Sequence, residues 1–253
     1  MRQRQVLIFG DSHVQAMRRA GKIISPDGLR AGFSAKLLSR IKNGAQIGDV
    51  SLEAAVEMVS ALAPDDLVAS AIGGNQHSVF GLIQHSVPFD VFEPGDETAT
   101  ISEDARCIPQ GILWDFFEGK LRESDGPRIV QLRRAARCAV CHIVPPPPKR
   151  DEAHILRHQE THFIEAGIRE KGVSPAALRL KLWRLQLRVL RKLCEDWEVG
   201  LLPPPPEALC AEGFLKPEYY AGDSTHANQA YGRLVLLQLD SIAAGHVAVA
   251  NGK

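Results

Sequence analysis

A serine stands where the first predicted strand turns into a helix. Gln5–Phe9 is a short apolar run that ends at Gly10, and Asp11 and Ser12 follow directly. A hydroxyl group there lies at the open end of a buried strand, and the start of the next helix adds partial positive charge. Because a serine hydroxyl is a poor nucleophile by itself, it needs a histidine base and a group that orients that histidine.

An aspartate and a histidine near the other end of the chain could supply both needs. Asp223 and His226 are three residues apart, so the carboxylate can accept a hydrogen bond from the imidazole and leave its other nitrogen free for Ser12. Acyl transfer also needs donors for a developing oxyanion. The backbone N–H groups of Ser12 and Gly48 and the side chain of Asn75 could provide them. These residues predict acyl-transfer chemistry.

The elements that must position these residues alternate along the chain. The predicted strands are continuously apolar, and they are Gln5–Phe9, Leu67–Ile72, Ala139–Val144 and Val199–Leu202. The predicted helices cover about 13–23, 51–62, 128–137, 174–194 and 228–244. Apolar strands that alternate with helices indicate a parallel sheet covered on both faces, with ligands at the carboxyl ends of its strands.

Two proline runs follow the third and fourth predicted strands. They are Pro145–Pro148 and Pro203–Pro206. Both should lie at the carboxyl edge of the sheet, where they could form stiff walls of a cleft. The alternative is that they are simply rigid strand exits.

Four short blocks resemble those of the SGNH (GDSL-like) hydrolases, and the resemblance covers nearly the whole chain. The blocks are Phe9–His13, Ile47–Asp49, Gly73–Asn75 and Asp223–His226, in the family's order. The resemblance implies Ser12 as nucleophile, Gly48 and Asn75 as oxyanion donors, Asp223 as supporting acid and His226 as base. Gly44 is a substitute candidate for Gly48. The implied fold is a flavodoxin-like three-layer α/β/α sandwich around a central parallel sheet.

Three positions depart from the family's common pattern. His13 replaces a leucine, Gln76 an aspartate and Ala227 a proline. A GDSH variant like the one here occurs in branches of the family that act on carbohydrate acyl groups. None of the departures removes a catalytic group, but they leave the substrate open. The chain contains no G-x-S-x-G pentapeptide, which argues against an α/β-hydrolase nucleophile elbow.

The composition excludes several classes of protein. The chain has 253 residues with 30 Lys and Arg against 30 Asp and Glu, so a polybasic nucleic-acid binder is not expected. No apolar run approaches the ~20 residues that span a bilayer, and no secretory signal is recognisable. The expectation is a cytoplasmic protein. Its five cysteines are expected to be free thiols, and its oligomeric state is not readable.

A long stretch between the second and third strands has no strong periodicity. Residues 76–127 hold six of the chain's Phe and Trp residues, namely Phe80, Phe89, Phe92, Trp114, Phe116 and Phe117. We interpret this stretch as an insertion, acting as a lid or cap, within a single domain of residues 1–253. An ordinary decorated loop is the alternative.

Three further patterns have simple structural explanations. Cys138 and Cys141 form a C-x-x-C pair, but along a strand they would point to opposite faces. His154, His158 and His162 stand four apart. Neighbouring pairs could share a metal, but all three could not, because the outer two would be ~12 Å apart along a helix, and a solvated helix face is the favoured interpretation. The basic amphipathic helix after Ser174 favours a sheet-covering helix over one that binds a membrane surface.

These observations lead to one main hypothesis and two alternatives. The main hypothesis is a serine esterase or acyl-hydrolase that cleaves an ester of a small molecule, carbohydrate or lipid through an acyl-enzyme on Ser12. The reaction needs neither a metal nor an organic cofactor. The alternatives are an acyltransferase that uses the same residues with a sugar hydroxyl as acceptor, and a non-catalytic module that binds a glycan or acyl group.

Overall fold

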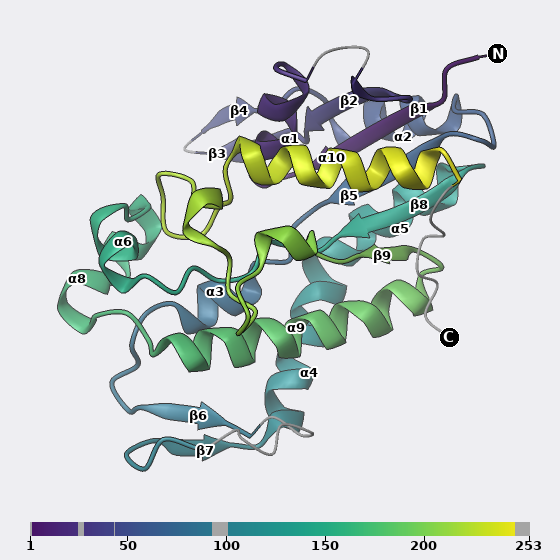
Figure 1. The fold of residues 1–253 in the computed structure, drawn as a ribbon. Coiled ribbons are helices and arrows are strands. Elements are labelled where there is room, and N and C mark those ends of the chain that lie inside the picture. The colour runs from purple at the N-terminus through teal and green to yellow at the C-terminus, as the bar shows by residue number, and fades with distance from the viewer. Residues whose placement is uncertain (1, 25–27, 43, 93–100, 246–253) are drawn as a thin grey trace.

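A five-stranded parallel sheet forms the centre of the computed structural model, which describes residues 2–24, 28–42, 44–92 and 101–245 (Figure 1). The strands are β1 (Gln5–Gly10), β2 (Gly32–Leu37), β5 (Leu67–Ala71), β8 (Ala139–Ile143) and β9 (Gly200–Leu202). Their spatial order is β2-β1-β5-β8-β9. Counted along the chain, this is the 2-1-3-4-5 order of flavodoxin-like folds, and the predicted α/β/α sandwich is confirmed.

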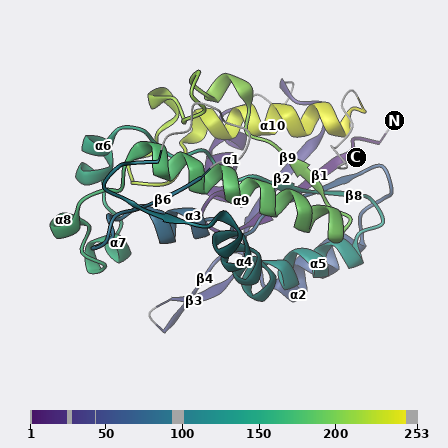
Figure 2. The same cartoon turned by 90° about the horizontal axis from the view of Figure 1, so that it is seen from below.

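Helices cover both faces of the sheet (Figures 1 and 2). One face carries α1 (Val14–Gly21) and α10 (Gln229–Ala243). The other carries α2 (Leu52–Ser60), α5 (Gly126–Ala135) and α9 (Ala176–Asp196). The leucines of α9 are buried in this second layer. The predicted sheet-covering role of that helix is therefore correct.

Close packing of α10 on α1 depends on a glycine. A Cβ atom on Gly232 would lie 2.3 Å from the carbonyl carbon and oxygen of Ala16. Since real side chains do not approach backbone so closely, only glycine lets the two helices touch here. This contact brings the chain that precedes α10 close to the turn that precedes α1.

One strand of the sheet was not predicted. β2 is an edge strand, paired only with β1, and each of its residues is partly exposed. Its sequence GFSAKL lacks the run of β-branched residues that marks a buried strand. A small hairpin of β3 (Arg40–Lys42) and β4 (Ala45–Ile47) follows it.

The stretch between β5 and α5 contains ordered elements. They are α3 (Gln76–Gly81), β6 (Phe89–Val91), β7 (Arg106–Ile108), α4 (Gln110–Lys120) and a π-helical turn, η2 (Leu121–Asp125). Residues 93–100 of the predicted insertion lie outside the described residues. Phe117 is fully buried in the main core, and Lys181 of α9 forms a buried ion pair with Asp90 of β6 at 2.9 Å. The predicted role as a lid stays a prediction.

Short helices replace the continuous helix expected around His154. They are α6 (Glu152–Arg157), α7 (Thr161–Glu165) and α8 (Ile168–Lys171), and His158 is the non-helical C-cap of α6. Two 3-10 turns, η3 (Pro206–Ala208) and η4 (Pro217–Tyr219), follow β9. The breaks mean that the three histidines do not share one helical face.

The cysteines behave as expected from the sequence. All five are free thiols. Cys138 and Cys141 belong to different core clusters, one on each face of the sheet, so the C-x-x-C pattern is not a paired site. Within the described residues no helix is long and apolar enough to cross a bilayer.

Candidate active site

Ser12 lies in the tight turn between β1 and α1. The turn is held by backbone hydrogen bonds from Asp11 N–H to the Ala71 carbonyl (3.1 Å) and from Val14 N–H to the Asp11 carbonyl (3.1 Å). The Ser12 carbonyl accepts from Gln15 as the helix begins. Among the described residues no acceptor takes the backbone N–H of Ser12. That N–H is therefore available to a ligand at the carboxyl edge of the sheet.

The loop before α10 brings a histidine and an aspartate to this serine. The Ser12 hydroxyl donates to His226 Nε2 at 2.7 Å, and His226 Nδ1 donates to Asp223 Oδ2 at 2.9 Å. The other oxygen of Asp223 accepts the backbone N–H of His226 at 2.7 Å. The aspartate therefore holds both the ring and the backbone of the histidine. This chain of bonds leaves Nε2 as an acceptor facing the hydroxyl.

The charge of Asp223 is stabilised from two sides. Partial burial would raise the pKa of this carboxyl, but hydrogen bonds from His226 and the nearby charge of Lys149 outweigh burial and lower the pKa below its ordinary value. Lys149 is fully buried, and its ammonium lies 3.6 Å from Asp223 Oδ1. It also donates to the backbone carbonyls of Ala221 and Asp223. The lysine is therefore a clamp on the loop as well as a counter-charge.

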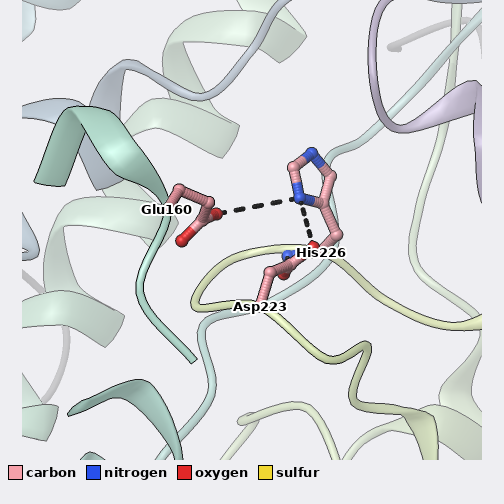
Figure 3. Close-up of side chains that lie close together, drawn as sticks. All are labelled: Glu160, Asp223 and His226. Carbon is pink, nitrogen blue, oxygen red and sulfur yellow. Dashed lines mark hydrogen bonds and ion pairs between the residues drawn. The ribbon is translucent and has the colours of Figure 1, made fainter. Parts of the chain in front are cut away.

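A second carboxylate lies beside the same imidazole (Figure 3). Glu160 Oε1 is 3.8 Å from His226 Nδ1. The same oxygen accepts the Thr225 hydroxyl at 2.8 Å, while Oε2 accepts the backbone N–H of Ser224 at 3.0 Å. Glu160 precedes α7, so a segment remote in sequence ties down the loop that carries His226.

The loop after β5, Gly73–His77, is held by side chains from three other elements. Asp11 accepts the N–H of Gly73 at 2.9 Å, and Asp125 accepts the N–H of Gly74 at 3.1 Å. Gln186 of α9 donates to the Gly74 carbonyl and accepts the His77 N–H. Gly73 has a φ of +61°, and a Cβ there would overlap the Asp125 carboxylate, so the position requires glycine.

One arginine links the two carboxylates of this network. Arg128 of α5 pairs with both oxygens of Asp11, at 3.0 and 3.1 Å, and reaches Asp125 at 3.0 Å. The Asp11 and Asp125 side chains are only 15% and 6% exposed. Two buried carboxylates so close together need such a cation. Asp125 is the last residue of the π-helical turn η2 and is buried there; such turns are frequent at functional sites.

The predicted oxyanion donors have different surroundings. Asn75 is exposed at the start of α3, and its side chain makes no capping bond to that helix. Gly48 lies against Leu38 and Ser39, just beyond the carboxyl end of β2, where a Cβ would meet Ser39 at 2.5 Å. Gly44, the substitute candidate, lies in the turn of the hairpin between β3 and β4. Donation by Gly48 and Asn75 stays a prediction.

His13 packs directly on the candidate base. Its ring centroid is 4.8 Å from that of His226. Burial, reinforced by neighbouring histidines, lowers the pKa of His13 to about 3, so the ring is neutral at ordinary pH. His13 and Ala227 line a small cavity of about 20 Å³ together with Pro145 and Pro146.

The proline runs therefore have different places in the molecule. Pro145 and Pro146 of the first run form part of a wall next to the candidate site. Pro203 of the second run lines another cavity, beside α9. The first run therefore lies beside the candidate site, and the role of the second run as a cleft wall stays a prediction.

The predicted histidine ladder is engaged in other contacts. His154 Nε2 faces the Ala221 and Asp223 carbonyls at 3.1 and 3.2 Å, and His158 Nδ1 donates to the His154 carbonyl at 2.9 Å. His162 packs on Phe163. These bonds occupy one ring nitrogen each of His154 and His158 with backbone carbonyls. The interpretation without a metal is favoured, although the continuous helix assumed for it is wrong.

Sequence reasoning missed the residues that support the site. They are Lys149, Glu160, Asp125, Arg128 and Gln186. Each is an ordinary polar residue in its local sequence. The only signal near any of them is the Asp125–Pro127 run, in which glycine and proline follow the aspartate.

Comparisons with known proteins find solved structures of low sequence identity. No protein-family model matches the chain, and no curated protein does. Solved structures similar to it include a GDSL-like lipase from Bacteroides thetaiotaomicron, with 12% identity over 96% of this chain and 89% of that one, and a TM-score of 0.49. Another is a carbohydrate acetylesterase from Sinorhizobium meliloti, with 14% identity, 97% and 100% coverage, and a TM-score of 0.47. With identities and TM-scores this low, it is the strand order of the sheet that defines the fold and the side chains at its carboxyl edge that define the chemistry.

Proposed function

We propose that this protein is a serine esterase or acyl-hydrolase that cleaves an ester of a small molecule, carbohydrate or lipid. The observation that carries the proposal is the continuous chain of hydrogen bonds from Ser12 through His226 to Asp223, with heavy-atom distances of 2.7 and 2.9 Å. A nucleophile, a base and an orienting carboxylate in this order are the requirement for acyl transfer through a covalent intermediate.

In the first half-reaction Ser12 Oγ attacks the ester carbonyl carbon while its proton passes to His226 Nε2. Asp223 stabilises the resulting imidazolium through Nδ1, and its lowered pKa keeps it ionised. The carbonyl oxygen becomes an oxyanion that receives the free N–H of Ser12, together with the predicted donors Asn75 and Gly48. Collapse of this intermediate expels the alcohol, which takes the proton from Nε2 and leaves the acyl group on Ser12.

The second half-reaction repeats these steps with water. His226 Nε2 removes a proton from the water molecule as its oxygen attacks the acyl carbon. The second tetrahedral intermediate then breaks at the bond to Ser12 Oγ, which takes the proton back. His13 stays neutral beside the ring because its pKa is about 3, so it adds no charge that opposes the imidazolium.

A fluorophosphonate probe tests the nucleophile directly. The wild type should be labelled, whereas Ser12→Ala should not, and His226→Ala should label far more slowly. Ser60→Ala serves as the matched control, since Ser60 is exposed at the end of α2 and should label like the wild type. Equal labelling of wild type and Ser12→Ala would refute the proposal.

Steady-state hydrolysis of p-nitrophenyl acetate gives the second readout. Removal of the nucleophile or the base from such a triad costs about 10⁴-fold or more in kcat. We expect losses of this size in Ser12→Ala and His226→Ala, and none in Ser60→Ala. A series of nitrophenyl esters of increasing chain length would then define the acyl group that the enzyme prefers.

A further inference from the structure

Three atoms that can bind a metal lie close together at the candidate base. They are His226 Nδ1, an oxygen of Asp223 and an oxygen of Glu160, and all lie within 4.8 Å of one another (Figure 3). Nδ1 is 2.9 Å from Asp223 Oδ2 and 3.8 Å from Glu160 Oε1. Ligands of a tetrahedral ion with bonds of ~2.0 Å are ~3.3 Å apart. Small side-chain rotations would therefore admit an ion among the three atoms.

The cluster has two carboxylates beside one imidazole, which donates a hydrogen bond to only one of them. With its proton on Nδ1, the neutral imidazole has one N–H group, and Asp223 already accepts it. Glu160 faces the same nitrogen but receives no hydrogen bond from it. Lys149, at 3.6 Å from Asp223 Oδ1, neutralises one of the two carboxylates. One negative charge remains, and the three side chains are 18–29% exposed, so an ion can reach them from solvent.

From this geometry we propose that Glu160, Asp223 and His226 bind a divalent transition-metal ion of the Zn²⁺ type, and that the bound ion switches the enzyme off. Binding needs only the three side chains. The inhibitory part rests on the proposed function, because it acts on the base of that reaction.

The inhibition follows from the two nitrogens of one ring. The ion takes the Nδ1 lone pair, so the ring proton that Nδ1 carried moves to Nε2 through solvent, and no net proton is released. Nε2 then bears a hydrogen and can no longer accept the proton of the Ser12 hydroxyl. The nucleophile loses its base while the fold stays intact.

The donor set also selects the ion. One imidazole and two carboxylates suit Zn²⁺, Ni²⁺ and Cu²⁺, whereas Ca²⁺ and Mg²⁺ prefer larger sets of oxygen ligands. We expect Zn²⁺ to bind and inhibit, and Mg²⁺ and Ca²⁺ to do neither at the same concentration.

Binding is tested without any activity, on the full chain with Ser12→Ala. Equilibrium dialysis of this protein against ZnCl₂ should show one bound ion per chain. Co²⁺ in place of Zn²⁺ should give the strong visible absorption of a four-coordinate cobalt site. Adding Glu160→Gln should weaken Zn²⁺ binding at least about tenfold, the lower end of losses seen even for outer-shell groups. Adding Glu165→Gln should leave Zn²⁺ binding unchanged, because Glu165 is an exposed residue of α7 outside the cluster.

A second variant covers the case in which Glu160→Gln disturbs the loop. His226→Ala in the Ser12→Ala protein removes the nitrogen ligand and should also weaken Zn²⁺ binding at least about tenfold. Unchanged Zn²⁺ affinity in both variants, or no stoichiometric binding by the parent, overturns the metal site whether or not the protein is an esterase.

Inhibition is tested on the protein with Ser12 intact. After treatment with a chelator, ZnCl₂ should inhibit p-nitrophenyl acetate hydrolysis by wild type and Glu165→Gln at similar concentrations. Glu160→Gln should need at least about ten times more Zn²⁺, compared with its own metal-free rate. Stoichiometric Zn²⁺ binding with full activity retained would overturn the inhibitory part alone. No hydrolysis in any metal-free sample would instead count against the proposed function.

Discussion

The two halves of the candidate site are held in different ways. On the nucleophile side, Ser12 and the loop after β5 are fixed by Asp11, Asp125, Arg128 and Gln186, which belong to the sheet or to the helices packed on it. On the base side, the loop of Asp223 and His226 is fixed by Lys149 and Glu160, which come from irregular chain after β8 and before α7.

This difference indicates which half tolerates change. On the nucleophile side each buried carboxylate and amide satisfies a backbone group, so a substitution leaves a buried partner unpaired. On the base side Lys149 is also buried, but the two carboxylates around His226, Glu160 and Asp223, are 18% and 29% exposed, against 15% and 6% for Asp11 and Asp125. We expect substitutions on the nucleophile side to cost stability and activity together. Those on the base side should act mainly on the charge around His226.

Among the residues that support the site, the largest effect is expected for Arg128→Met. It leaves the carboxylates of Asp11 and Asp125 buried without their cation, which costs about 3 kcal/mol in the free energy of unfolding. The loop that carries Asn75 should also loosen, so kcat should fall well below the wild-type value. Urea denaturation and ester hydrolysis measure the two effects. Arg134→Met, an exposed change on the same helix, should stay within ~0.5 kcal/mol; equal effects of the two variants would contradict the network.

Gln186→Leu should have the next largest effect. Gln186 is 1% exposed, and its loss leaves the Gly74 carbonyl and the His77 N–H without their partner. Such unpaired buried groups cost about 2 kcal/mol. Because the same loop holds Asn75, kcat for p-nitrophenyl acetate should fall more than KM rises. Leu187→Ala, on the same helix, serves as the control for lost packing, and a kcat loss equal to that of Gln186→Leu would argue against a positioning role.

Lys149 predicts a pH dependence of stability. Burial lowers the pKa of Lys149 from 10.5 to about 8, although the negative charges of Asp223 and Glu160 act to raise it. Below pH 8 the folded and unfolded chains both hold the proton, so the cost of burying the charge is fully present. Between pH 8 and 10.5 only the unfolded chain keeps the proton, so the free energy of unfolding should rise with pH relative to Lys149→Met.

Denaturation of both proteins below pH 8 and near pH 10.5 measures that difference. The gap between wild type and Lys149→Met should be largest at the higher pH and should shrink as the pH falls through 8. A gap that is independent of pH would show that Lys149 has an unperturbed pKa in the folded protein.

The smallest effect on the metal-free enzyme is expected for Glu160→Gln. Its amide oxygen can still accept the Ser224 N–H, and its amide NH₂ can donate to the Thr225 hydroxyl in place of the bond that the second carboxylate oxygen accepted, so the loop should keep its shape. Loss of one charge 3.8 Å from His226 Nδ1 should lower kcat a few-fold, because that charge stabilises the imidazolium, with KM unchanged. A loss as large as that of Arg128→Met would mean that the base side is as tightly coupled as the nucleophile side.

Local sequence determined the parts of this protein that depend on neighbours along the chain. Four of the five sheet strands follow from apolar runs that end at glycine or proline, and the turn at Ser12 follows from the first of them. Asp223 and His226 were found because a short spacing can bring a carboxylate to an imidazole. Such short blocks can be recognised from the sequence because the residues in each block are neighbours along the chain.

Tertiary structure alone decided the rest. β2 is a strand because β1 offers it an open edge, although its own sequence has little strand preference. Arg128 meets Asp11 across 117 residues, and Lys149 reaches Asp223 across 74. The local sequence of an arginine or lysine does not reveal whether it will be buried or which carboxylate will face it. Those contacts exist only because the packed helices and the loop before α10 exclude water around them, which makes each charge depend on a partner far along the chain.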